Sequence, residues 1–452
     1  MAACVPEYSA CSIAGSCCAP HRCFRQSQFF AQCGRACPRD PSWECHAERM
    51  RRVGVILSRW GSWPAWTPLL MHTLRANAKV EFLLVTDVRP AGTLPPNVAV
   101  HNVSLDGLLA RARATVGSRL VSLGGTDGGK FASGVSANKV NDLKPMYGEI
   151  FADLLAEFGW WGHLQEDVVL GDLLTLLPPD VRDGYDVATP AAAPNATGGV
   201  RPRGVFMLYR NAESVNRLWR TAATAERVLA TPQYLAFDEG GWVALRGHDS
   251  LATVLAREVA AGRIRAWHAP GGALAADKLP GVLEPDHWMV ACWRRGVLVV
   301  NPPPQHARRC VLEGADAPST PPPPPAAILH LAFSKHRPPL GRLPLRHEQI
   351  DGAAAFVLTS DGLWLPSAER WTLVSGAAPH SAVGVVVDGA ELAAYLERVV
   401  AYAEALRRSK TRLPPKPARP CAIGCAGRAA EAVCNARLAA VAIGRCAART
   451  RS

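Results

Sequence analysis

A group of acidic and amide side chains follows a strongly apolar segment in the middle of the chain. Trp160 to Leu164 is predicted to form a buried strand, and Gln165, Glu166 and Asp167 follow it directly. Hard divalent cations such as Mg²⁺ and Mn²⁺ prefer carboxylate oxygens, and a diphosphate supplies further oxygen ligands. Such a cation also stabilises the charge that develops on a departing diphosphate. We therefore predict a metal site that serves a nucleoside diphosphate.

The three polar residues at this strand end are not equivalent. Alternate residues of a strand face the same side, so Gln165 and Asp167 are expected to point together, with Glu166 turned away. Asp167 is the predicted metal ligand, with Gln165 as a further, neutral residue of the predicted metal site. Because Gln165 is a neutral amide, it would add no negative charge to this site, and weaker metal binding, a metal-independent reaction and an inactive domain all stay open.

Other charged residues are candidates for the remaining chemistry. Asp238 and Glu239 are predicted to activate an acceptor hydroxyl, which needs a general base in an inverting transfer; acids at a helix N-terminus are the alternative. Asp87 ends a predicted strand and is a candidate contact for a uracil or ribose, with an ordinary acid at a strand end as the alternative. Lys144 is a candidate partner for phosphate and Asp142 lies beside it, although Asp142 also suits a helix cap.

The composition favours a large globular protein. The chain has 452 residues, 48% of them hydrophobic and 19% charged, with a formal net charge of +12. Because the arginines are scattered and no basic stripe alternates with aromatic residues, nucleic acid is not a predicted partner. No run of eighteen apolar residues occurs, so no membrane span is expected.

Apolar strands alternate with helical segments through the centre of the chain. Strands are predicted at 53–57, 81–87 and 98–103, and helices at 64–77 and 144–158. This alternation is typical of an α/β domain with a mostly parallel sheet and helices on both faces.

The predicted domain boundaries follow changes in composition. A small cysteine-rich module covers 1–48, the α/β domain covers 52–337 with a Pro-rich insert near 302–325, and a C-terminal extension covers 345–452. The extension is expected to be partly helical and contains a Pro-rich linker at 414–420 and a tail with four cysteines.

The cysteines are concentrated near the N-terminus. Eight of the 14 cysteines lie within the first 45 residues at irregular spacings, which favours a disulfide framework over a zinc module. We therefore expect an extracellular or secretory-lumen protein. Because no signal peptide is visible, an incomplete N-terminus is expected as well.

The segment from Cys18 to Cys33 resembles the fungal-type cellulose-binding module. Ser27, Phe29, Phe30, Gln32 and Cys33 fit its closing pattern of a small polar residue, aromatics and Gln-Cys. The resemblance implies that Phe29 and Phe30 stack on sugar rings while Gln32 bonds hydroxyls, and that the partner is a cellulose- or chitin-like polysaccharide. A disulfide knot with the Phe pair as its core is the alternative.

A second resemblance covers about residues 52–337. The segments that carry it are Asn138 to Gly148, Trp160 to His163, Gly171-Asp172, Phe206 to Asn211, Asp238 to Gly240, and His330 with Lys335. In this order they are similar to an uncharacterised family of glycosyltransferase-like proteins of the GT-A type. The resemblance implies a nucleotide-binding α/β sheet with an acidic metal site. It also implies His330 as a further metal ligand, with a core histidine as the alternative.

Together these observations predict a glycosyltransferase-like protein that takes a sugar from a nucleotide-sugar donor and is targeted by a polysaccharide-binding module. Whether it is an enzyme depends on the Gln165-Glu166-Asp167 motif, because the family that the chain resembles has an acid at the position of Gln165, in an Asp-x-Asp-like motif. A non-catalytic carbohydrate-binding protein with a degenerate transferase domain is the first alternative. A glycoside hydrolase is the second, although no pair of opposed carboxylates is evident.

Overall fold

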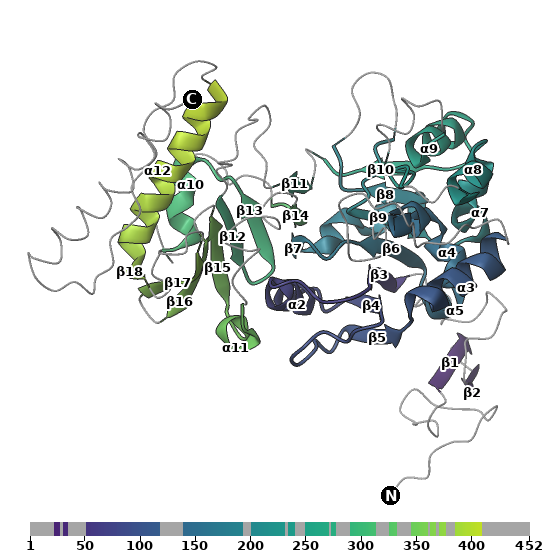
Figure 1. Ribbon diagram of the computed structural model, residues 1–452, viewed down its shortest axis with the longest axis horizontal. Coiled ribbons are helices and arrows are strands. Elements are labelled where there is room, and N and C mark those ends of the chain that lie inside the picture. The colour runs from purple at the N-terminus through teal and green to yellow at the C-terminus, as the bar shows by residue number, and fades with distance from the viewer. Residues whose placement is uncertain are drawn as a thin grey trace, which may run out of the picture.

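The computed structural model describes the chain in fourteen segments. They are 22–27, 30–34, 51–117, 139–192, 200–230, 234–239, 249–270, 273–276, 290–312, 325–331, 345–359, 362–367, 370–376 and 385–408. Two large bodies lie side by side in Figure 1, one around a seven-stranded sheet and the other around a six-stranded sheet. Within the described segments, no helix is long and apolar enough to cross a membrane.

The larger body is built on a mostly parallel sheet. In sheet order its strands are β10 (Ala266–His268), β8 (Val187–Thr189), β9 (Phe206–Arg210), β6 (Trp160–Leu164), β3 (Val53–Arg59), β4 (Val80–Thr86) and β5 (Val98–Asn102). Only β9 runs against its neighbours, β6 and β8, and the other paired strands are parallel. The predicted α/β class with a mostly parallel sheet is confirmed.

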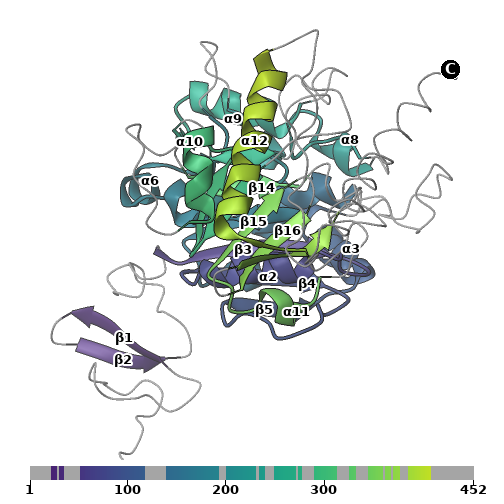
Figure 2. The same ribbon diagram turned by 90° about the vertical axis from the view of Figure 1, so that its left-hand side faces the viewer.

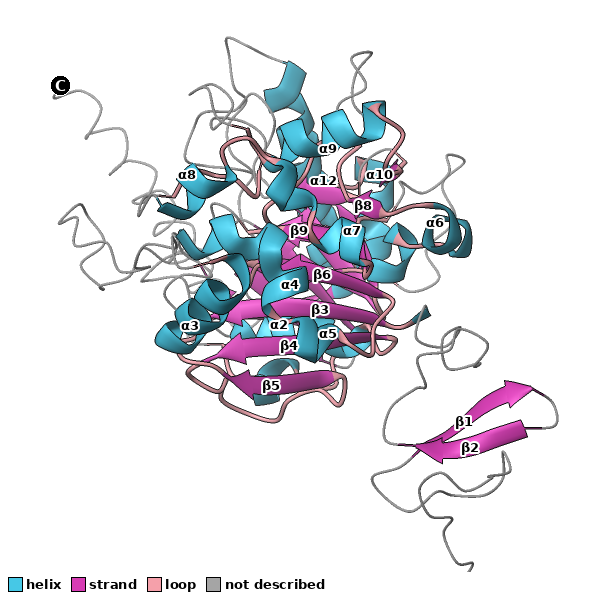
Figure 3. Cartoon of the chain, turned by 90° about the vertical axis from the view of Figure 1, so that its right-hand side faces the viewer, coloured by secondary structure: helices cyan, strands magenta, loops and turns pink. Residues whose placement is uncertain are grey.

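Helices cover both faces of this sheet because its central strands are apolar on both sides. Ile56 of β3 packs in one buried cluster, whereas Val55 and Leu57 pack in the other, as the strand alternation requires. On the Ile56 side lie α3 (Leu105–Val116), α4 (Tyr147–Ile150), α5 (Ala152–Leu155) and α9 (Leu251–Ala260) (Figure 3). On the opposite side lie α2 (Thr67–Ala76), η2 (Leu173–Leu176) and α6 (Pro179–Gly184).

The predicted helix at 144–158 is divided into shorter pieces. The structure has the 3₁₀ helix η1 (Lys139–Met146), followed by α4 and α5. Pro145 lies inside η1 and has no backbone N–H to donate, which disfavours a continuous α-helix through this point. The remaining helices of the larger body are α7 (Glu213–Asn216), η3 (Leu218–Thr221) and α8 (Ala225–Ala230).

The smaller body is an antiparallel sheet with one long helix. In sheet order its strands are β13 (Val297–Val300), β12 (Val290–Arg294), β15 (Ala355–Thr359), β16 (Gly362–Ser367), β17 (Arg370–Gly376) and β18 (Val386–Asp388). Helix α12 (Gly389–Arg408) lies along one face (Figure 2), with α10 (Pro304–Ala307) and η5 (Arg308–Cys310) nearby. Two strands, β12 and β13, thus come from the segment assigned above to 52–337.

Two local features fix the β12–β13 hairpin. Arg295 and Gly296 both have positive φ angles, 47° and 87°, as a tight two-residue hairpin turn requires. A disulfide joins Cys292 on β12 to Cys310 in η5. The sequence Arg294-Arg295-Gly296 between two apolar runs favours this hairpin, in which Arg294 pairs with Val297.

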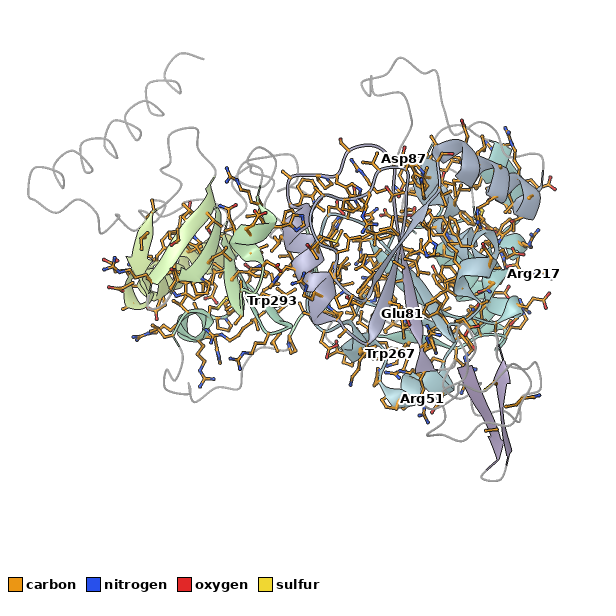
Figure 4. All side chains as sticks on the ribbon, turned by 90° about the horizontal axis from the view of Figure 1, so that it is seen from below. Arg51, Glu81, Asp87, Arg217, Trp267 and Trp293 are labelled. Carbon is orange, nitrogen blue, oxygen red and sulfur yellow. A yellow bond between two sulfur atoms is a disulfide. The ribbon has the colours of Figure 1, made fainter. Side chains whose placement is uncertain are left out.

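The other face of the six-stranded sheet packs against α2 of the larger body. Trp293 donates its indole N–H to the carbonyl oxygen of Leu170 at 2.9 Å, and its ring lies 4.8 Å from that of His72. Arg75 of α2 forms an ion pair with Asp351, just after α11 (His347–Ile350). Figure 4 shows Trp293 where the two bodies meet.

A three-stranded sheet also lies near this junction. Its strands, in order, are β11 (Leu274–Ala276), β14 (Ile328–His330) and β7 (Val168–Leu170). Gly171 follows β7, and its amide N–H donates to the carbonyl oxygen of Ala327 at 2.9 Å. A Cβ atom on Gly171 would collide with the carbonyl oxygen of Ala326 and lie 3.0 Å from Cβ of Leu298. Only glycine therefore allows this approach of the two backbones.

The described part of the N-terminal module is a hairpin of β1 (Arg22–Ser27) and β2 (Phe30–Gly34). Cys33 is buried and disulfide-bonded, and Gln32 pairs with Phe24 across the hairpin. Phe29 lies outside the described residues, and of Phe30 only the backbone is described. Polysaccharide binding by this module stays a prediction.

Replacing Gly171 with alanine should destabilise the protein by about 1–3 kcal/mol, because the new methyl group forces β7 and β14 apart. The matched control is Gly184→Ala in α6, where a Cβ meets no atom within 4 Å and alanine favours the helix. Urea unfolding followed by tryptophan fluorescence measures both. Equal unfolding midpoints for the two variants would contradict the close approach.

Candidate functional site

The carboxyl ends of β3 and β6 form the edge at which a ligand site is expected. From β3 the chain proceeds outward to β4 and β5, whereas β6 joins β3 on its other side. This is a topological switch point, and open α/β sheets bind ligands outside the carboxyl ends of strands at such a point. The Arg59 guanidinium at the end of β3 bonds Glu166 Oε1 after β6 at 2.6 Å.

Asp167 and His330 meet although they are far apart in sequence. Nε2 of His330 lies 3.2 Å from Oδ2 of Asp167. The register of β14 on β7 produces this contact, since His330 pairs with Val168 and the Leu331 N–H donates to the Asp167 carbonyl oxygen at 2.7 Å. The His330 side chain is 23% exposed and that of Asp167 only 3%, so His330 forms the outer side of the pair.

The Asp167–His330 pair could supply two protein ligands to a cation, fewer than a cation site built from protein alone needs. Among the described residues, no three His, Cys, Asp or Glu side chains are close enough to hold a metal ion. Mg²⁺ is commonly bound by one or two protein ligands plus substrate phosphates, and adjacent ligands in its octahedral shell lie about 3 Å apart. The 3.2 Å separation is the length of a hydrogen bond between the two side chains. Glu166 is already paired with Arg59.

Gln165, the amide predicted to face with Asp167, is half-buried. Its backbone N–H donates to the carbonyl oxygen of Val205 at 3.0 Å, which ties the end of β6 to the segment that precedes β9. Gln165 therefore lies beside the Gly204–Val205 backbone, whereas the contacts of Asp167 are with β14.

A buried ionic cluster lies on the other side of this backbone. Asp238 is fully buried, accepts a hydrogen bond from the Tyr234 hydroxyl at 3.1 Å and lies 3.5 Å from the Lys144 ammonium. Lys144 also donates to the carbonyl oxygen of Gly204 at 2.6 Å. Burial raises the pKa of Asp238 to about 7, opposed by Lys144 and reinforced by Glu239.

Asp142 holds the turn that carries Asp238. Its carboxylate accepts the backbone N–H groups of Leu235 at 2.9 Å and Phe237 at 2.8 Å. These two residues flank Ala236, whose φ of 55° is unusual for a residue other than glycine. Lys139 donates to the same carboxylate at 3.0 Å. Burial raises the pKa of Asp142 despite the Lys139 charge.

Asp142 and Lys144, predicted to contact the cofactor, are thus engaged inside the protein. Both are buried, and their described polar contacts lead to protein groups. Glu239 differs, because it is partly exposed. A Cβ on Gly204 would collide with Asp238 and lie 2.8 Å from Oε1 of Glu239, so Gly204 leaves room for both carboxylates.

Asp87 lies exposed at the carboxyl end of β4 and accepts the backbone N–H of Gly61 at 2.8 Å. Figure 4 shows it at the opposite end of that strand from Glu81. The neighbouring loop is held by Trp60 and Trp63, whose indole N–H groups donate to the carbonyl oxygens of Val103 and Val88 at 2.9 and 2.5 Å. Asp87 therefore stands at the same sheet edge as Gln165 but two strands away.

The structure brings some predicted residues together and shows others that the sequence did not suggest. Asp167 joins His330, and Asp238 joins Lys144. Arg59, Tyr234 and Gly204 were not predicted. A basic residue at the end of the first strand was the available signal for Arg59, whereas the roles of Tyr234 and Gly204 depend on contacts between distant segments.

A separate hollow of about 360 Å³ lies away from this edge, beside α3, α4 and α7. Glu149 lines it and accepts hydrogen bonds from Arg217, Trp219 and Arg220. The carboxylate of Glu149 is thus already bound by neighbouring side chains, so we assign no ligand to this hollow.

Comparisons with known proteins give one family model that matches part of the chain and a number of distantly similar solved structures. A model of a family of unknown function, DUF6625, matches residues 55–261, a little under half of the chain. No curated protein matches the chain.

Galactosyltransferase LgtC in complex with donor and acceptor sugar analogues is 11% identical, with a TM-score of 0.27 over 66% of this chain and 93% of that one. Mouse xyloside xylosyltransferase 1 is 10% identical, with a TM-score of 0.28 over 51% and 88%. The glycosyltransferase GlyE of Streptococcus pneumoniae TIGR4 is 12% identical, with a TM-score of 0.19 over 39% and 42%. Scores of this size carry no argument about function.

The raised pKa of Asp238 should make stability depend on pH. Folding holds a proton that the unfolded chain releases near the ordinary value of 3.8, so the free energy of unfolding should fall from about pH 4 to about pH 7. The free energy of unfolding of the unaltered protein should fall more steeply with pH than that of Asp238→Asn, by at most about 1.4 kcal/mol per pH unit. Urea unfolding of both proteins across this range measures the difference. Parallel pH profiles would show that Asp238 does not titrate in this way.

Proposed function

We propose that this chain is a glycosyltransferase-like enzyme of the GT-A type, which transfers a sugar from a nucleotide-sugar donor to a glycan or related acceptor. The observation that carries the proposal is the Asp167–His330 contact of 3.2 Å beside the switch point of the sheet. A carboxylate and an imidazole at this position are suitable ligands for a divalent cation that also binds a diphosphate.

Asp167 and His330 would hold the cation, and Gln165 stands beside them as a neutral group. When bound, a divalent cation stabilises the negative charge that develops on the departing diphosphate. His330 lies at the end of β14 and Asp167 directly precedes β7 of the same small sheet, so their positions are fixed before substrate binds. The Arg59–Glu166 ion pair keeps a second acid from competing for the cation.

Glu239 is the proposed general base for the acceptor hydroxyl. It is the partly exposed member of the Asp238-Glu239 pair, and only an accessible carboxylate can take a proton from a bound substrate. Asp238 is buried and linked to Lys144 and Tyr234, so it positions the turn and the charge around Glu239. Asp142 and Lys144 also position this turn, Asp142 through the backbone N–H groups of Leu235 and Phe237 and Lys144 through Asp238.

Asp87 is the proposed contact for the nucleoside. It is exposed at the carboxyl end of β4, on the side of β3 away from β6 and Asp167. A donor that extends from Asp87 to Asp167 would lie across the ends of β4, β3 and β6. The acceptor then approaches from the β9 side, where Glu239 stands.

The second candidate is a non-catalytic carbohydrate-binding protein that keeps this fold. Gln165 favours it, because the amide contributes no negative charge to a cation site. The cysteine-rich module and the transferase domain would then both serve recognition of glycans outside the cell.

Asp167→Asn should abolish the rise in melting temperature that nucleoside diphosphates with Mn²⁺ produce in the unaltered protein, because a carboxylate ligand is lost. His330→Ala should reduce it. The control is Asp172→Asn, which changes an exposed acid at the N-cap of η2. A thermal-shift series with a panel of nucleoside diphosphates checks this. If the unaltered protein shows no shift with any of them, the non-catalytic candidate is favoured.

Glu239→Gln should lower kcat by about 100-fold or more while the nucleotide-induced thermal shift is kept, because only the proton acceptor is removed. The matched control is Glu213→Gln, whose side chain is 76% exposed on α7 and paired with Arg217. Release of nucleoside diphosphate from a panel of nucleotide sugars gives the rates. Unaltered turnover in Glu239→Gln would remove Glu239 from the reaction.

A further inference from the structure

The segment from Val200 to Val205 runs across the carboxyl ends of β8 and β6 and is firmly held. The Thr189 hydroxyl donates to the carbonyl oxygen of Arg201 at 2.7 Å, and Lys144 donates to that of Gly204 at 2.6 Å. The backbone N–H of Gln165 donates to the carbonyl oxygen of Val205 at 3.0 Å. Groups on three elements thus fix this backbone against the edge that carries the candidate site.

Two arginines project from this fixed backbone into solvent. Arg201 and Arg203 are exposed, whereas Pro202 between them is buried. Both arginine residues are therefore accessible to a ligand from solvent, on either side of the buried Pro202. Among the described residues, the Arg203 guanidinium has no ion pair or hydrogen bond, which leaves its donors available.

Arg201 extends this basic surface toward the edge of the sheet. Its charge lowers the pKa of the half-buried His268 at the end of β10, after the larger effect of burial. Because β8 is separated from β6 by β9, and strands are spaced by about 4.8 Å, the Arg201 backbone lies about 10 Å from the end of β6. A short oligosaccharide can span that distance.

We propose that Arg201 and Arg203 recognise an anionic sugar of the acceptor glycan, so that the substrate is an acidic polysaccharide or oligosaccharide. This inference rests on the proposed transferase function. The shared chemistry is a carboxylate or sulfate ester on a sugar ring near the reacting hydroxyl. The guanidinium group suits either anion, because its planar N–H donors bind two oxygens at once.

The position of these arginines favours the acceptor over the phosphates of the donor. The donor lies over β4, β3 and β6 in the proposed function, and Arg59 at that edge is paired with Glu166. Arg201 lies on the other side of β6, and Gly204, which contacts Glu239, is adjacent to Arg203. An anion held here is therefore near the proposed general base. The net charge of +12 also attracts a polyanion from solution.

The test is binding of defined oligosaccharides to the full chain by isothermal titration calorimetry. The probes are trigalacturonic acid, a sulfated galactose trisaccharide and a neutral galactose trisaccharide. We expect one or both acidic probes to bind and the neutral probe to bind at least about tenfold more weakly. Arg201→Ala and Arg203→Ala should each weaken the binding of the acidic probe by about tenfold. Arg217→Ala, which removes an exposed charge at the end of α7 (Figure 4), should leave the binding of the acidic probe unchanged.

Three results would overturn the inference. The first is equal binding of acidic and neutral probes, and the second is an equal effect of Arg203→Ala and Arg217→Ala. The third is loss of the nucleoside diphosphate and Mn²⁺ thermal shift in Arg203→Ala, which would assign the arginines to the donor. Acidic binding without any nucleotide response in the unaltered protein would instead count against the transferase function while the anion site stands.

Discussion

The antiparallel pairing of β14 with β7 is the constraint on which the candidate site depends. It brings His330 to Asp167 across 163 residues of sequence. Two neighbouring contacts support the pairing, namely the Trp293 indole bond to Leu170 and the close approach that Gly171 permits. A shift of β14 by one residue would turn His330 to the opposite face of its strand, since side chains alternate along it. The pair therefore exists only while the small sheet keeps its register.

Four charged groups are buried near the candidate site, where their burial costs free energy but fixes the positions of the surrounding backbone. Lys139 and Asp142 form one ion pair and Lys144 and Asp238 another, all at most 3% exposed in their side chains. Burial lowers the pKa of Lys139 and raises that of Asp142, so desolvation outweighs their attraction. Backbone groups complete the hydrogen bonding, including the two N–H groups that fix Ala236. The result is a rigid support for Glu239.

The sequence predicted strands and strand ends, which depend on local patterns of apolar residues. It did not predict contacts between distant segments, which depend on how the strands pair. The apolar strands around Val53 and Trp160 and the strand-end position of Asp167 followed from periodicity. The exposed Asp87 also stands at a strand end, as expected. By contrast, the burial of Asp142 and Lys144 follows from contacts with the distant 204 and 234–239 segments. No periodicity near residue 290 reveals that β12 pairs with β15 rather than with the parallel sheet.

The route of the chain between the two bodies limits where the protein can be cut into fragments that fold. The chain leaves the larger body to form β12 and β13, returns to it as β14, and then leaves again for β15. A fragment that stops near residue 337 would keep the first two strands of the six-stranded sheet and lose the other four. Its Trp293 would then lack Phe356, the ring stacked on it at 5.1 Å. Cloning by sequence boundaries alone would thus yield an aggregation-prone polypeptide, and an expression design has to keep residues 51–408 together.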